Sequence, residues 1–102
     1  MASGANGRGL VQRVKDARRA YRGPFSGLDI EQVVRDAGYL PAFEEEEAFL
    51  IFRKAGCKPI PVNPEWREIW DDDPIFRCLQ RDLKISRAKL CIRLNQARRD
   101  AR

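Results

Sequence analysis

The C-terminal quarter of the chain decides how it folds: residues 74–99 read PIFRCLQRDLKISRAKLCIRLNQARR. This stretch has no internal glycine or proline, and its apolar residues recur at helical spacing, at Phe76, Leu79, Leu83, Leu90 and Leu94. Asp73 followed by Pro74 is a favourable helix start. We therefore expect one basic helix of about 26 residues, or about 39 Å. The alternative is a kink or a second helix that starts at Ser86.

Charge is unevenly distributed along the chain. Residues 1–28 carry six basic residues (Lys or Arg) and one acidic residue. Residues 29–73 carry five basic and twelve acidic residues, and residues 74–102 carry nine basic and two acidic residues. The net charges are thus +5, −7 and +7. An acidic middle between two basic segments is typical of a protein that docks on an acidic surface, because each basic segment attracts opposite charge.

The N-terminal segment predicts a basic amphipathic helix over residues 10–21. Its bases surround a narrow apolar stripe and include Arg13, Arg18 and Arg19. Such a helix suits an anionic membrane surface, an acidic partner or a mitochondrial import signal, and an ordinary solvated helix explains it as well. We expect no secretory signal, since residues 1–9 lack an apolar run. We divide the chain into a basic arm, residues 1–28, and a helical domain, residues 29–102.

Two helices are predicted in the acidic middle of the chain. Asp29 and Gln32 form a capping-box pattern that predicts a helix start, and Gly38 predicts its end. Pro41 and the glutamates at 44–47 predict a second helix start, because proline and negative charge favour the first turn. This second helix would cover residues 43–55, with an apolar run at 49–52 that exceeds what a small core can bury.

A short helix that carries two tryptophans is predicted next. Asn63 and Pro64 resemble an N-cap and the first helical residue, and Trp66 and Trp70 follow. Two tryptophans in five residues predict an anchor, in the core or at an interface. The chain as a whole therefore predicts an all-α fold, a small bundle of about five helices with an amphipathic N-terminal helix and a long basic C-terminal helix.

Composition argues against most catalytic classes. The chain has no histidine and no nucleotide-binding or nucleophile-elbow motif. The glutamates at 44–47 would point in different directions on a helix, so we expect a solvated face there and no metal site. Three cysteines without CxxC spacing predict buried thiols in a reducing compartment. The longest apolar run, residues 48–52, is too short to span a membrane. We predict no enzyme activity, no cofactor and no metal.

Residues 83–94, LKISRAKLCIRL, resemble the helix-turn-helix of Fis-type DNA-binding domains, where a turn before Ile-Ser-Arg leads into a recognition helix. Lys84 stands where the family has a turn glycine, and Gln80 where it has a small residue. An ordinary basic helix with no DNA-binding role would account for the same sequence. The resemblance implies that phosphates or guanine edges in a major groove would be bound by Arg87, Lys89 and Arg93.

The order of elements over residues 29–84 resembles the small matrix-side subunit of respiratory complex III, the ubiquinol-cytochrome c reductase binding protein family. That family has an Asp-led helix with an arginine, a Leu-Pro, a helix, a second Leu-Pro-like turn, a tryptophan and an acidic turn before a charged helix. The matching residues here are Asp29 with Arg35, Leu40-Pro41, residues 43–55, Ile60-Pro61, Trp66 and residues 71–73. The resemblance implies a non-catalytic helical subunit.

We accordingly predict a non-catalytic accessory subunit that supports assembly and stability of a mitochondrial inner-membrane respiratory complex, with complex III as first candidate. It would be peripheral, on the matrix side, and would contact other subunits and anionic lipid. The alternative is a small helix-turn-helix DNA-binding regulator. The residues predicted to contact partners are Phe49, Phe52, Trp66, Trp70, Arg13, Arg18, Arg19, Arg87 and Arg93.

Overall fold

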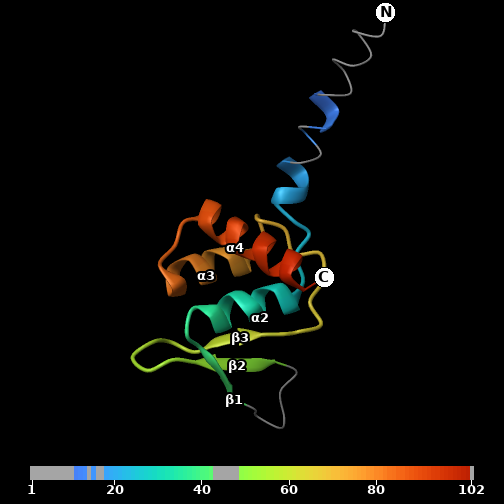
Figure 1. The fold of residues 1–102 in the computed structure, drawn as a ribbon. Helices are drawn as coiled ribbons and strands as arrows, with labels where there is room; N and C mark the ends of the chain where they lie inside the picture. Colours follow the sequence, from blue (N-terminus) through green and yellow to red (C-terminus); the bar gives the residue numbers. More distant parts are fainter. Residues whose placement is uncertain (1–10, 14, 16–17, 43–48, 102) are drawn as a thin grey trace, which may run out of the picture.

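The computed structural model describes residues 11–13, 15, 18–42 and 49–101 of the 102-residue chain. The described residues between 11 and 21 are helical and lead into the folded body (Figure 1). The body consists of α2 (Gly27–Asp36), β1 (Leu40–Ala42), β2 (Leu50–Arg53), β3 (Ile60–Val62), α3 (Pro74–Leu83) and α4 (Arg87–Asp100). The prediction of an all-α bundle is wrong, because the chain forms a mixed fold with a three-stranded antiparallel sheet.

The predicted helix over residues 43–55 is replaced by part of that sheet. β2 is the central strand and pairs with β1 and β3, with Pro41 opposite Phe52 and Ile51 opposite Pro61. Both edge strands carry a proline, which limits pairing with further strands. The apolar run at 49–52 is explained by the strand geometry, since successive side chains point to opposite faces. The glutamates at 44–47 lie outside the described residues.

The tryptophan segment is not a helix either. Phe25 and Ile69 exchange backbone hydrogen bonds of 2.7 and 2.9 Å, and the Gly27 N–H donates to the Trp66 carbonyl at 2.8 Å. These backbone groups are therefore used in pairing with the chain just before α2, and a helix would need them for itself. The Asn63 side chain does accept a hydrogen bond, from the Glu65 N–H at 2.8 Å, but it closes a turn instead of capping a helix.

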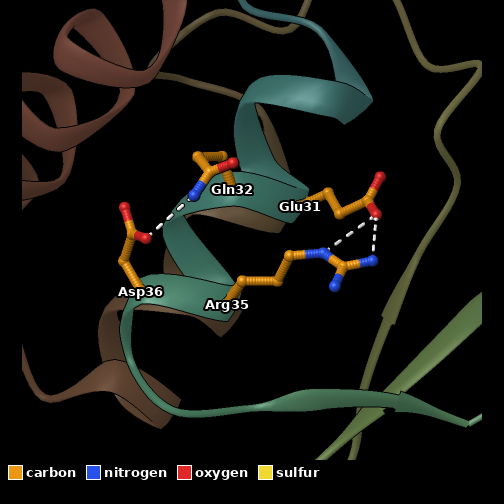
Figure 2. A network of polar contacts seen from close by, with 4 residues as sticks. All are labelled: Glu31, Gln32, Arg35 and Asp36. Carbon is orange, nitrogen blue, oxygen red and sulfur yellow. Dashed lines mark hydrogen bonds and ion pairs between the residues drawn. The ribbon is translucent and has the colours of Figure 1, made fainter. Parts of the chain in front are cut away.

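α2 starts two residues earlier than its predicted cap. Ser26 is the N-cap and Asp29 is the N3 residue of the capping box, with hydrogen bonds of 3.2 and 2.9 Å between side chain and backbone. Gly38, with φ of 95°, follows the end of the helix as predicted. The exposed face of α2 carries two side-chain pairs one turn apart, Glu31 with Arg35 and Gln32 with Asp36 (Figure 2). Such pairs each add about 0.2–0.5 kcal/mol to a helix.

α2 lies between the sheet and the pair of C-terminal helices (Figure 1). The buried residues form one core that takes side chains from every element except β1, and it extends to Phe25, ahead of the residue-29 boundary predicted for the helical domain. The expectation of buried thiols holds only for Cys91, because Cys57 and Cys78 are exposed. All three are free. None of the helices in the described part of the chain is long and apolar enough to cross a membrane.

Candidate functional site

The C-terminal stretch forms two helices joined by a three-residue turn. α3 ends at Leu83, and Lys84 adopts the left-handed conformation with φ of 56° and ψ of 45°. The next helix begins with Ser86 as its N-cap, whose hydroxyl accepts a hydrogen bond from the Lys89 N–H at 3.2 Å. Ile85 donates its N–H back to the Gln80 carbonyl at 3.2 Å. The alternative of a second helix starting at Ser86 is therefore confirmed, and the single long helix is wrong.

α4 presents one face to the core and another to solvent. Leu90, Cys91, Leu94 and Ala97 are buried against α2 and α3. The opposite face is exposed, and the residues on it are Lys89, Ile92, Arg93, Gln96, Arg99 and Asp100. Ile92 keeps 54% of its surface in water although it is a large apolar side chain. The sequence could have identified Ile92, because it falls outside the helical stripe that contains Leu90 and Leu94.

Further basic side chains surround this exposed face. Arg87 opens α4, Lys84 lies in the turn, and Arg77 and Arg81 are exposed on α3. Arg81 donates to the Asp82 carboxylate at 3.1 Å, and this hydrogen bond raises the pKa of Arg81 above its usual value. Two of the predicted contact residues, Arg87 and Arg93, thus lie on one helix and face solvent. The arrangement offers cations and hydrogen-bond donors to an anionic surface.

The N-terminal segment is attached to α4 through side-chain hydrogen bonds to backbone carbonyls. The Tyr21 hydroxyl donates to the Ala88 carbonyl at 2.8 Å, and the Asn95 amide donates to the Tyr21 carbonyl at 2.8 Å. Arg98 donates to the carbonyls of Ala20 and Pro24 at 2.9 and 3.3 Å. Partial burial, and secondarily the Cys91 thiol, raise the pKa of Tyr21, which keeps its hydroxyl proton available. Arg98 is therefore a structural link between two segments.

A basic groove of about 400 Å³ lies between the N-terminal segment and the chain just before α3. The Arg19 guanidinium lies 5.7 Å from the centre of the Trp70 ring. Arg22 lies 3.8 Å from the Asp71 carboxylate. Trp70, predicted as an anchor, is half-buried here and forms part of the wall. The full lining is Lys15, Arg18, Arg19, Arg22, Trp70, Asp71 and Asp72.

The remaining predicted contact residues lie near the sheet or at the far end of the N-terminal segment. Phe49 is 38% exposed, and its ring meets the half-buried Trp66 ring edge-on at 5.9 Å. Phe52 is completely buried in the core, so its predicted role in partner binding is wrong. Arg13 is exposed on the N-terminal segment, away from the groove lining. The sequence did not indicate this separation, because a local apolar pattern does not show that Phe49 precedes β2 whereas Phe52 lies within it and points into the core.

No cluster of three or more acidic or cysteine side chains that could hold a metal ion occurs within residues 11–13, 15, 18–42 and 49–101. Comparisons of the chain with protein-family models, with curated proteins and with solved structures found no match. Three surface features of the described residues could contact a partner: the exposed face of α4, the basic groove, and the aromatic pair of Phe49 and Trp66 beside the sheet.

Proposed function

We propose that the protein binds double-stranded DNA through α3, the turn at 84–86 and α4, with α4 in the major groove. The observation that carries this proposal is the left-handed turn at Lys84, after which α4 restarts with its own cap and an exposed basic face. A major groove about 12 Å wide admits one α-helix. The proposal takes up the helix-turn-helix resemblance of residues 83–94, in which Lys84 occupies the position of the turn glycine.

The side chains on the exposed face of α4 suit the major groove of DNA. Lys89 and Arg93 are one turn apart on α4, and both are exposed. Cations on such a helix contact phosphates or the acceptor atoms of guanine, and an apolar side chain such as Ile92 fits a thymine methyl group. The buried side of α4 holds the helix against α2, so the exposed side is presented on a fixed support.

A matched pair of variants tests this proposal. We expect Lys89→Gln/Arg93→Gln to weaken binding of the full chain to a duplex, measured by fluorescence anisotropy at about 50 to 200 mM KCl. The control, Lys58→Gln/Arg67→Gln, removes the same charge from two exposed positions away from α4. Equal weakening by both pairs, or no duplex binding by the parent chain, would refute the proposal.

A second candidate is the accessory subunit of a mitochondrial respiratory complex. It is supported by apolar surface near the sheet, where Leu40 is 71% exposed and Phe49 packs on Trp66. The resemblance behind it is weaker now, because residues 50–53 form a strand where that family has a helix. Affinity purification of the tagged chain followed by mass spectrometry tests it. Respiratory subunits that disappear with Phe49→Ser would support this candidate, and their absence from the parent sample would exclude it.

A further inference from the structure

The basic groove beside α4 contains more positive charge than its own carboxylates neutralise. Four of its residues are cations and two are acids. Arg22 is engaged with Asp71, and Arg19 lies over the Trp70 ring. Lys15 and Arg18 are exposed, and neither forms an ion pair with another described residue. Two cations on consecutive turns of the segment are thus available to an external anion.

The segment that carries these cations is held in a defined position relative to α4. Three side chains, Tyr21, Asn95 and Arg98, link it to α4 by the hydrogen bonds described above. Arg98 also lies over the Phe25 ring, with 5.2 Å from the guanidinium carbon to the ring centre, which ties the junction to the core. Any surface that α4 contacts therefore approaches the N-terminal segment as well.

Helix periodicity shows on which side of α4 the segment lies. It contacts α4 at Ala88 and Asn95, two turns apart on one side of the helix. Ile92 and Arg99 follow these two residues by one turn each and are exposed. The N-terminal segment consequently contacts α4 at one edge of its exposed face, and Figure 1 shows the described residues of the segment extending away from the body.

We infer that the segment around Lys15 and Arg18 is a second contact with the same duplex, which binds backbone phosphates beside the groove that receives α4. This inference rests on the proposed function. Exposed Lys and Arg side chains bind phosphates without reading sequence, and each contact releases counterions. The segment thus contributes affinity and salt dependence, whereas α4 contributes sequence preference.

The charge of the groove agrees with a polyanionic partner better than with a single buried anion. Lys15 and Arg18, which pair with no other described residue, lie on an exposed helix, and the groove is open on the solvent side. An open row of cations suits phosphates that recur along a strand. Asp71 on the opposite wall keeps Arg22 engaged and leaves the outer cations to the DNA.

The salt dependence of duplex binding tests the inference. Each phosphate contact adds about 0.9 to the slope of log affinity against log salt, so Lys15→Gln/Arg18→Gln should reduce the slope by about 1.8. Between about 50 and 200 mM KCl the parent chain should then lose about twelvefold more affinity than this variant. The full chain and a generic duplex of about 20 base pairs are used, with Lys58→Gln/Arg67→Gln as the control of equal charge. Circular dichroism verifies that each variant is folded.

The outcomes separate this inference from the proposed function. If the α4 variant loses binding and the Lys15/Arg18 variant retains the parent slope, the second contact is refuted and the DNA-binding proposal stands. If the parent binds no duplex but binds vesicles of anionic phospholipid through Lys15 and Arg18, both are overturned. A reduced slope for the Lys15/Arg18 variant alone, with the control slope equal to the parent, supports the second contact.

Discussion

Replacing Lys84 by glycine should stabilise the protein, which is the reverse of what glycine does inside a helix. Lys84 has φ of 56° and ψ of 45°, a conformation that side chains with a Cβ adopt at a cost. Its side chain is exposed and forms no hydrogen bond or ion pair with another described residue. The substitution therefore removes backbone strain at the turn and no packing contact.

The expected gain follows from two opposing terms. The left-handed conformation costs a residue other than glycine roughly 1–2 kcal/mol. Glycine loses roughly 0.5–1 kcal/mol more backbone entropy on folding. The net gain in the free energy of unfolding is then about 0–1.5 kcal/mol, with a midpoint of about 0.75 kcal/mol. For a domain of about 60–100 residues, 1 kcal/mol corresponds to about 4–8 °C in Tm.

Two pairs of variants isolate this backbone effect. Lys84→Gly is compared with Lys84→Ala, because both lose the same charge and differ only in the Cβ. Lys89→Gly and Lys89→Ala make the same comparison at an exposed position inside α4, where glycine should be about 0.8–1.0 kcal/mol less stable than alanine. Urea unfolding followed by circular dichroism gives the free energies of unfolding.

The two comparisons should have opposite signs. If Lys84→Gly were less stable than Lys84→Ala, by an amount similar to the difference at position 89, residue 84 would belong to a continuous helix. The description of α3 and α4 as separate helices would then be wrong, and with it the main support for the DNA-binding proposal.

Three further predictions concern the core, a close backbone contact and a thiol. Leu90→Ala should cost about 2–5 kcal/mol of unfolding free energy, whereas Ile92→Ala should cost less than about 1, as thermal unfolding will show. Gly27→Ala should lower Tm by an amount equivalent to about 1–3 kcal/mol, because its Cβ would overlap the Asn63 carbonyl oxygen; a Tm equal to the parent's would contradict this close approach. Burial raises the pKa of the Cys91 thiol in the folded protein. The neutral thiol therefore contributes fully to the free energy of unfolding at pH values below the unfolded pKa of about 8.5, and this contribution is lost as the pH rises through the folded-state pKa. Cys91 should accordingly react with iodoacetamide much more slowly than the two exposed cysteines, and equal rates would contradict its burial.

The local signals in the sequence that proved correct depend on only a few neighbouring residues. Asp73 with Pro74 starts α3, Gly38 follows the end of α2, and Ser86 starts α4. Of the predicted apolar stripe, Phe76, Leu79, Leu90 and Leu94 are buried, and Leu83 is partly buried. Helix caps and apolar helical stripes depend on residues within one or two turns of each other, so they can be recognised in the local sequence. The basic face of α4 could be predicted for the same reason.

The tertiary structure alone decided the sheet, the position of Trp70 and the attachment of the N-terminal segment to α4. Residues 49–52 are apolar on every side, and such a run is compatible with a helix or a strand until its partners are known. The pairing of Phe52 with Pro41 and with Ile60 makes it a strand and buries its ring in the core. Likewise, nothing in the sequence separates Arg98 from the other arginines of the chain. Its role as a link to the N-terminal segment depends on the carbonyls of Ala20 and Pro24, which only the folded structure brings close to it. These contacts join residues far apart in the chain, so no local pattern encodes them.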